Sequence, residues 1–242
     1  VVKSQEAKKG GLDISLLDRC MNFENAVVLL NRQYRMNNAI MAYSNAYFYN
    51  NELISDDTVA THALLNDEDS YLSKSLEFID TAGCNFEEIQ NPETLSHYNP
   101  QEGTILFKHL CQLSNDYAQH PELPNINIGI ISPYREQREW LMDNLAAYEV
   151  NRSKIKTLAI KTIDGFQGEE RDVIYISLVR SNDKQEIGFL SDLRRMNVAI
   201  TRAAKKLVVI GDSATIGSNP FYKGFLEHCE KHGLYRSAWE WL

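Results

Sequence analysis

Short apolar runs alternate with longer stretches of helical periodicity along this chain, and that alternation limits the folds open to it. Parallel strands need a helix-length connection between them, so an alternation of this kind favours a parallel sheet. The predicted strands are Val27–Leu30, Leu76–Ile79, Ile126–Ile131, Thr157–Ile160, Val173–Val179 and Leu207–Ile210. The predicted helices are Asn38–Tyr49, Pro100–Leu113, Pro133–Tyr148, Asp192–Ala204 and Phe221–His232.

The predicted fold class is therefore α/β, with an open, mostly parallel sheet covered by helices on both faces. Asn99-Pro100-Gln101-Glu102 has the residue order of a capping box and predicts a helix start, as does Ser132-Pro133. The chain has 242 residues, of which 43% are hydrophobic and 24% charged, which excludes disordered and fibrous classes.

The negative charge of the chain is concentrated in one segment. The net charge is −8, but residues 56–102 hold eleven acidic residues against one base, Lys74, so the rest of the chain is slightly positive. Because local charge governs phosphate binding, this distribution permits a nucleic-acid partner. The chain has no signal peptide and no apolar run of about 18 residues, so no membrane contact is expected. Four scattered cysteines without a C-x-x-C pair predict reduced thiols in a cytoplasmic, intracellular protein.

Three polar clusters are predicted to lie beyond the carboxyl ends of strands, where parallel sheets bind their ligands. The first cluster is Asn31–Met36, in which Tyr34 could stack on a base while Arg35 contacts a phosphate. A solvated loop is the ordinary interpretation of such a pair. The second cluster is Thr162–Asp172, where two glycines let the backbone approach a ligand closely.

The third cluster is Asp192–Ala203, on a predicted helix. Leu193, Met196, Ile200, Ala203 and Leu207 have the spacing of a buried stripe. The predicted basic stripe consists of Arg195, Ala199, Arg202 and Lys206. A solvated basic face is common, but two arginines one heptad apart with no acid expected beside them suit a polyanion.

Taken together, these segments resemble the second RecA-like domain of superfamily 1 helicases. The resemblance is to the 5′→3′ branch, which includes the nonsense-mediated decay helicase and the immunoglobulin mu-binding helicase. Four strings carry it in family order and extend it over nearly the whole chain: Gln33–Met36, Ile128–Gln137, Thr162–Val173 and Ile187–Ala203.

The resemblance implies that ATP binds between this domain and a first motor domain. Arg35 and Arg202 would be the catalytic arginine fingers that stabilise negative charge at the γ-phosphate. Tyr34 would stack on the adenine, and Glu170 would accept a hydrogen bond from the ribose. The residues predicted to bind the nucleotide are Tyr34, Gln167, Gly168 and Glu170.

The resemblance also implies that single-stranded nucleic acid crosses another edge of the same sheet. A helix that starts at Ser132-Pro133 would offer unpaired backbone amides to a phosphate. Binding would be largely independent of base sequence, and the choice between DNA and RNA is left open. The residues predicted to contact the strand are Ser132, Pro133, Tyr134, Thr162, Asp164 and Arg180.

The sequence contains no G-x-x-x-x-G-K-[ST] loop to hold β- and γ-phosphates. The opening Val1–Ser4 resembles the segment that follows the end of a first motor domain. We therefore expect residues 1–25 to be a linker from that domain and residues 26–242 to be the second motor domain. Mg²⁺ ligands are expected on the first domain, so this chain alone should bind nucleotide poorly and hydrolyse almost none.

Two other interpretations remain open from the sequence. A stand-alone, non-catalytic nucleotide- or nucleic-acid-binding module would use the same residues without a partner domain. A metal-dependent nuclease would use the carboxylates that gather around one predicted strand, although such nucleases usually place a Lys beside the second carboxylate and none is present here. Those carboxylates belong to Glu77, Asp80, Glu87 and Glu88.

Overall fold

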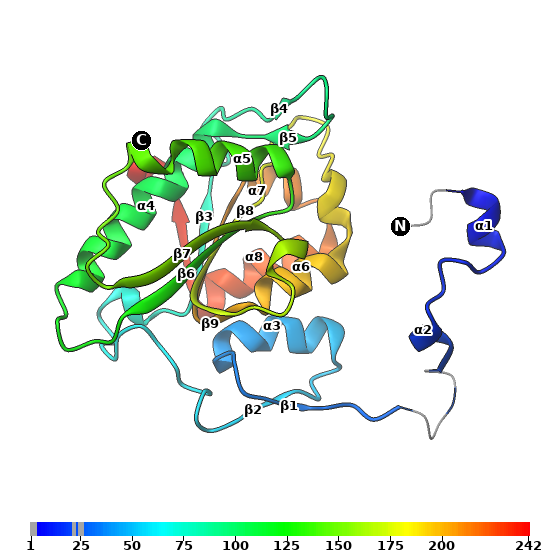
Figure 1. Ribbon diagram of the computed structural model, residues 1–242, viewed down its shortest axis with the longest axis horizontal. Helices are drawn as coiled ribbons and strands as arrows, with labels where there is room; N and C mark the ends of the chain where they lie inside the picture. The colour runs from blue at the N-terminus through cyan, green and yellow to red at the C-terminus, as the bar shows by residue number, and fades with distance from the viewer. Residues whose placement is uncertain (1–3, 21–22, 24–26) are drawn as a thin grey trace. The chain divides into compact units, whose positions relative to one another are not determined.

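The computed structural model describes residues 4–20, 23 and 27–242, and the chain divides into the units Val1–Arg32 and Gln33–Leu242 (Figure 1). The described part of the first unit contains two short helices, α1 (Gln5–Lys9) and α2 (Leu16–Cys20). Ser4 caps α1 by accepting a hydrogen bond from the Ala7 amide. The boundary predicted at residue 25 falls within this unit, beside residues that lie outside the described part, and it stays a prediction.

The strand predicted at Val27–Leu30 is wrong, because these residues form an extended loop that pairs with no strand. Val28 and Leu30 are 85% and 86% exposed. A strand forms where its backbone finds a pairing partner, and apolar composition alone does not supply one.

The second unit is built on a six-stranded sheet in which every neighbouring pair runs parallel. The strand order is β10-β3-β9-β8-β6-β7. The strands are β3 (Leu76–Asp80), β6 (Ile126–Ser132), β7 (Ile155–Thr162), β8 (Arg171–Ser177), β9 (Ala203–Gly211) and β10 (Leu234–Ser237). The predicted α/β class and five of these strands are confirmed, whereas β10 was missed because it is a short, half-buried edge strand.

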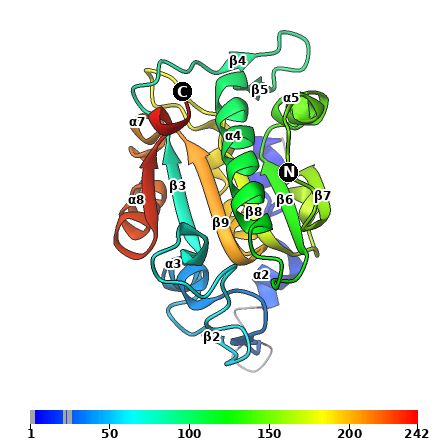
Figure 2. The ribbon, with the colours of Figure 1, turned by 90° about the vertical axis from the view of Figure 1, so that its left-hand side faces the viewer.

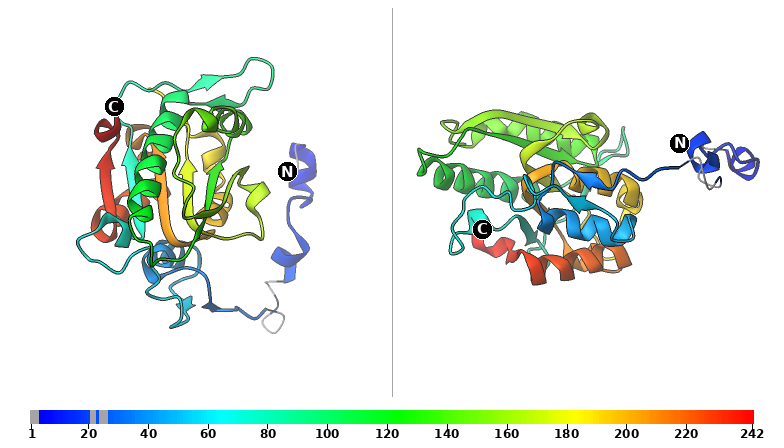
Figure 3. Two further views of the ribbon diagram at one scale, coloured as in Figure 1. Left: turned by 60° about the vertical axis from the view of Figure 1, so that its left-hand side comes forward. Right: turned by 90° about the horizontal axis from the view of Figure 1, so that it is seen from below.

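Helices cover both faces of this sheet (Figure 2 and Figure 3). On one face lie α4 (Pro100–Ala118), α5 (Arg135–Asn144) and the C-terminal turn η5 (Ala238–Trp241). On the other face lie α3 (Asn38–Phe48), α6 (Leu193–Ile200) and α8 (Pro220–His232). Smaller elements are the short helix α7 (Ser213–Ile216) and two two-stranded ladders, β1 (Arg32–Gln33) with β2 (Ile54–Ser55), and β4 (Ile89–Gln90) with β5 (His97–Tyr98).

The basic stripe predicted on the third cluster is wrong. Helix α6 ends at Ile200, four residues earlier than predicted, and β9 begins at Ala203. Lys206 therefore lies in the central sheet, fully buried, with its Nζ 2.8 Å from Oε2 of the equally buried Glu77. The Lys206 ammonium also donates to the carbonyl oxygens of Tyr71 (3.1 Å) and Lys74 (2.9 Å). It is committed to the core and cannot contact a ligand.

A short connection between β7 and β8 places the predicted site residues. Strand β6 lies between these two strands, so the connection has to cross β6. It contains one 3-10 turn, η3 (Asp164–Phe166), and it buries the Phe166 ring completely. The ring lies against Gly129 of β6, where an added Cβ would be 2.6 Å from the Phe166 Cζ atom. The lack of a side chain at Gly129 therefore lets this connection lie close to the sheet.

We expect Gly129→Ala to destabilise the chain by about 1–3 kcal/mol, because the new methyl group overpacks the core at Phe166. Urea unfolding measures the change. Gly165→Ala is the control in the same connection, since its added Cβ would come no closer than 3.3 Å to a neighbour. Equal costs for the two variants would contradict the close-packing role of Gly129.

Candidate functional site

Two arginines from segments far apart in the sequence meet around Thr201. The Arg35 Nη1 atom donates to the Thr201 carbonyl oxygen at 3.1 Å, and the Arg202 Nη2 atom donates to the Thr201 hydroxyl at 3.4 Å. Burial lowers the pKa of Arg202, and the nearby positive charge of Arg35 lowers it further. Two like charges held this close favour an anionic ligand between or beside them.

Backbone carbonyls orient Arg202 without neutralising it. Its Nε donates to the Val198 carbonyl at 2.9 Å, and its Nη1 donates to the Glu169 carbonyl at 3.3 Å. Arg35, in contrast, pairs with Glu170 at 2.6 Å, with side chains that are 29% and 59% exposed. An ion pair this exposed contributes only about 0–1 kcal/mol, so a phosphate could replace Glu170 at little cost.

The Tyr34-Arg35 segment is held by Gln33, a residue to which the sequence analysis gave no role. Its Oε1 accepts hydrogen bonds from the amides of Arg35 and Met36, both at 2.8 Å. Its Nε2 donates to the Met36 carbonyl and the Ser55 hydroxyl, both at 2.7 Å. The Tyr34 side chain itself is 66% exposed and free to stack on a ligand. One indication of this role was present in the sequence, since Gln33 is a polar residue directly before the Tyr-Arg pair.

The predicted nucleotide residues lie at the amino ends of the strands, and the prediction that they lie beyond carboxyl ends is wrong. Glu170 directly precedes β8 and Arg202 directly precedes β9, and the amide of Arg171 donates to the Arg202 carbonyl at 3.1 Å. The error arose because the β7–β8 connection runs along β6. It leaves the carboxyl end of β7 and reaches the amino end of β8, so its later residues lie at the amino ends of the strands. Gly168, with φ of +83°, and the exposed Gln167 lie in the later part of that connection.

The third cluster is also more neutral than predicted. Arg195 has two acidic neighbours, Asp164 at 3.4 Å and Asp192 at 3.5 Å, where none was expected. Asp164 and Gln167 line a cavity of about 260 Å³ together with residues of α6. Arg202 remains the arginine of this cluster that is turned toward Arg35.

The predicted nucleic-acid residues gather at the opposite edge, beyond the carboxyl ends of β6, β7 and β8. Ser132 and Tyr134 are only 0% and 1% exposed, and the Ser132 hydroxyl accepts a hydrogen bond from the Tyr134 amide at 3.2 Å. Helix α5 begins at Arg135, two residues later than predicted. Its N-cap residue Tyr134 makes no side-chain cap, and the Ser96 hydroxyl accepts a hydrogen bond from the Glu136 amide at 3.4 Å. Pro133 is half-buried, and the Thr162 hydroxyl accepts from the Gly165 amide at 3.4 Å. Backbone amides, more than these side chains, are what this edge could offer to a strand.

Arg180 is placed differently from the prediction of a direct strand contact. Its side chain is buried, and its Nε lies 2.8 Å from Glu88 Oε2. Its Nη1 contacts the Tyr134 hydroxyl at 3.4 Å. Gly188 makes room for it, since a Cβ there would lie 2.1 Å from Arg180 Nη1. Arg180 therefore fixes the loops at this edge and does not project from it.

A buried carboxyl group supports the turn that precedes Arg180. Val179 has φ of +74°, which is strained for a β-branched residue, and both oxygens of Glu102 accept its amide at 3.0 Å. Burial raises the pKa of Glu102 to about 8. The capping box is thus only half formed. The Asn99 side chain accepts a hydrogen bond from the Glu102 amide. The Glu102 carboxyl group, however, accepts hydrogen bonds from Ser177 and Val179, and the Asn99 amide donates to Gln137 Oε1 instead.

The carboxylates weighed for a nuclease do not converge. Glu77 is paired with Lys206, and Glu88 is paired with Arg180. Asp80 accepts hydrogen bonds from Ser213 and Tyr235. Within residues 4–20, 23 and 27–242, no group of three His, Cys, Asp or Glu side chains is arranged to hold a metal ion. None of the helices described there combines the length and apolarity of a membrane span.

Comparison with known proteins relates this chain to helicases. The family model described as "AAA domain" matches residues 12–214. DNA-binding protein SMUBP-2 of Rattus norvegicus is 35% identical over 99% of this chain and 24% of its own length. DNA polymerase alpha-associated DNA helicase A of Saccharomyces cerevisiae is 35% identical over 97% of this chain and 36% of its own length. The chain thus spans about a quarter to a third of these relatives.

Two further matches are shorter or weaker. Regulator of nonsense transcripts 1 homolog of Arabidopsis thaliana is 41% identical over 43% of this chain and 8% of its own length. The C-terminal domain of a possible DNA helicase from Lactobacillus plantarum WCFS1 is a solved structure with a TM-score of 0.43 and 10% identity. That match covers 85% of this chain and 99% of the solved one.

We expect the stability of the chain to fall between pH 5 and 8 relative to a Glu102→Gln variant. Folding raises the pKa of Glu102 from 4.5 to about 8. In this window the folded chain keeps a proton that the unfolded chain has lost, so the free energy of unfolding decreases by up to about 1.4 kcal/mol per pH unit. Urea unfolding at several pH values measures this slope, with exposed Glu230→Gln as the control. Parallel profiles for wild type and Glu102→Gln would refute the assignment.

Proposed function

The chain belongs to the AAA domain family of superfamily 1 helicases, and from this premise we propose that it is the second motor domain of an ATP-dependent DNA or RNA helicase. The observation that carries the proposal is the meeting of Arg35 and Arg202 around Thr201, at one edge of the sheet. Glu170 forms its ion pair with Arg35 and acts on Arg202 only through its nearby charge, while the Arg202 guanidinium is hydrogen-bonded to carbonyl and hydroxyl oxygens.

In this proposal both guanidiniums act as arginine fingers on the γ-phosphate of ATP. Glu170 releases Arg35 when the phosphate arrives and accepts a hydrogen bond from the ribose instead. Tyr34 stacks on the adenine, and the positive φ at Gly168 lets the backbone before Glu170 come close to the nucleotide. Gln167 lies near the phosphates. The exposure of Tyr34 and the weak Arg35–Glu170 pair support these assignments.

The remaining nucleotide contacts come from a partner domain. The chain has no phosphate-binding loop, and the described residues offer no cluster of metal ligands. We therefore propose that a first motor domain of the same protein binds Mg²⁺ and the β-phosphate, and that this chain alone hydrolyses almost no ATP. Mg²⁺ would neutralise charge on the phosphates, while Arg35 and Arg202 complete that neutralisation from across the cleft.

Single-stranded nucleic acid is proposed to cross the opposite edge of the sheet. The amino end of α5, after Pro133, where the N-cap residue adds no side-chain cap, would bind a backbone phosphate through its amides. Thr162 and Asp164 would contact the strand beside it. Ser132, Tyr134 and Arg180 would shape this surface from below, since all three are buried. Contacts of this kind read the backbone and are independent of base sequence.

We expect Arg202→Ala to lower kcat for ATP hydrolysis by about 10³–10⁵ when this chain is joined to its first motor domain. Single-strand binding should change little, because Arg202 lies at the other edge of the sheet. A nucleic-acid-stimulated phosphate-release assay and a strand-binding titration measure the two effects. Exposed Arg152→Ala makes the same charge change elsewhere and is the control. Normal turnover in Arg202→Ala would disprove the finger role.

Tyr34→Ala should raise the KM for ATP about tenfold, because stacking on a base is worth roughly 1–3 kcal/mol. Tyr34→Phe keeps the ring and should keep the KM of the wild type. Steady-state kinetics with ATP and GTP, in the same joined protein, test both variants. Tyr34 does not stack on the base if its removal leaves both KM values unchanged.

A further inference from the structure

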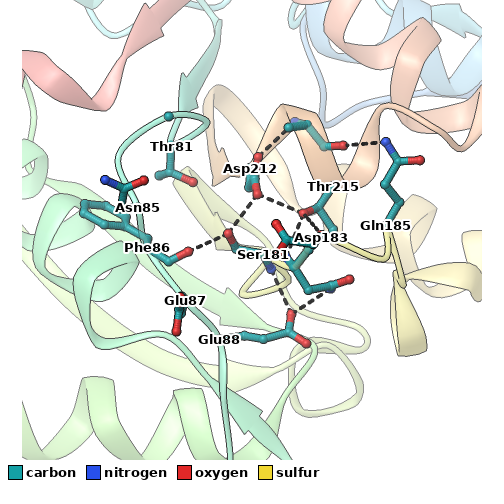
Figure 4. A pocket seen from close by; sticks show the side chains of 13 residues that line it. Thr81, Asn85, Phe86, Glu87, Glu88, Ser181, Asp183, Gln185, Asp212 and Thr215 are labelled. Carbon is teal, nitrogen blue, oxygen red and sulfur yellow. Dashed lines mark hydrogen bonds between the residues drawn. The ribbon is translucent and has the colours of Figure 1, made fainter.

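A cavity of about 660 Å³ lies beyond the carboxyl ends of β3, β8 and β9 and is unused by the proposed function (Figure 4). It lies at a topological switch point, where the connections after two neighbouring strands lead to opposite faces of the sheet. The connection after β3 leads to α4 on one face, whereas the connection after the neighbouring β9 leads to α8 on the other face. Open α/β sheets bind ligands at such switch points, because the two diverging loops leave a crevice.

The wall of this cavity is negative. Its lining includes Glu87, Glu88, Asp183 and Asp212 and contains no Lys, Arg or His. Asp212 is fixed by hydrogen bonds from the hydroxyls of Ser181 and Thr215, both at 2.8 Å. Phosphates and other anions would be repelled here, so the cavity is unsuited to a nucleotide or to a nucleic-acid backbone.

A second feature of the wall is a polar group without a partner. The Thr81 side chain is only 2% exposed, and its Oγ1 atom makes no hydrogen bond. Figure 4 shows the Thr81 side chain pointing into the cavity between Asn85 and Asp212. Buried hydroxyls nearly always have a partner, and an unsatisfied one is costly. A ligand with N–H donors would supply that partner.

We propose that this cavity binds an organic cation, an alkylammonium or guanidinium group. Its volume is within the range of small-molecule sites, and the described residues contain no cluster suited to a bare metal ion. The exposed carboxylates of Glu87 and Asp183 attract the charge, and the Thr81 hydroxyl accepts a hydrogen bond from the nitrogen. The cation could be a free polyamine or the side chain of a basic peptide.

Binding in the cavity would affect the proposed strand-binding residues at the same edge of the sheet through Glu88. This carboxylate lines the cavity and also binds Arg180, whose guanidinium contacts Tyr134. It also accepts the Ser181 amide at 2.8 Å. A cation that draws Glu88 toward the cavity therefore weakens the hold on Arg180.

Calorimetric titration of the 242-residue chain with spermidine and with the blocked peptide acetyl-Gly-Arg-Gly-amide tests the proposal. Saturable binding of either probe is expected, and the tighter one identifies a polyamine or a basic side chain as the source. The double variant Glu87→Gln/Asp183→Asn should bind at least about tenfold more weakly, since two attractive charges are lost. Asp143→Asn/Glu230→Gln makes the same charge change on exposed helix surfaces and should bind like the wild type.

Thr81→Val provides an independent readout. Removing an unpartnered hydroxyl should leave the Tm unchanged or slightly higher while weakening binding of the probe several-fold. Lack of binding by both probes, equal weakening in the two double variants, or unchanged affinity in Thr81→Val would each overturn the proposal.

Discussion

The close contact between Phe166 and Gly129 determines where the candidate site residues lie. It allows a short connection to cross β6 and to enter β8 from the far edge of the sheet. Thr162 therefore stays with the carboxyl ends of the strands, while Glu170 reaches Arg35 at the amino ends. Thr162 and Glu170, one from each of the groups that we propose for nucleic acid and nucleotide, thus lie at opposite ends of the strands. One continuous segment joins them, and within it Asp164 and Gln167 line the same cavity.

Burial and pairing divide the basic residues into two classes. Lys206 and Arg180 are buried beside carboxylates, and both hold elements of the fold in place. Removing one partner of such a pair leaves an uncompensated charge in the core, which is strongly destabilising. Arg202 instead rests on carbonyl oxygens, and Arg35 has one exposed partner. Of these four residues, Arg35 and Arg202 have positive charge available for an anionic ligand.

The sequence was sufficient to predict elements that have a strong hydrophobic periodicity and capping residues at a clear end. The α/β class, five central strands and the start of α4 at Pro100 follow from apolar runs and capping residues. Val27–Leu30 and Lys206 were misjudged because pairing and burial depend on distant partners that local patterns do not contain. Gln33 and the 660 Å³ cavity were missed for the same reason, since each combines segments far apart in the chain.

Gln33 has a consequence for any ligand that meets Tyr34 and Arg35. Three hydrogen bonds between its side chain and the backbone of Arg35 and Met36 already fix this segment, and a fourth joins Gln33 to the Ser55 hydroxyl. Ordering a loop on binding costs conformational entropy, which is subtracted from the affinity. Folding has already ordered this segment, so a ligand that binds at this edge does not lose affinity to the cost of ordering it.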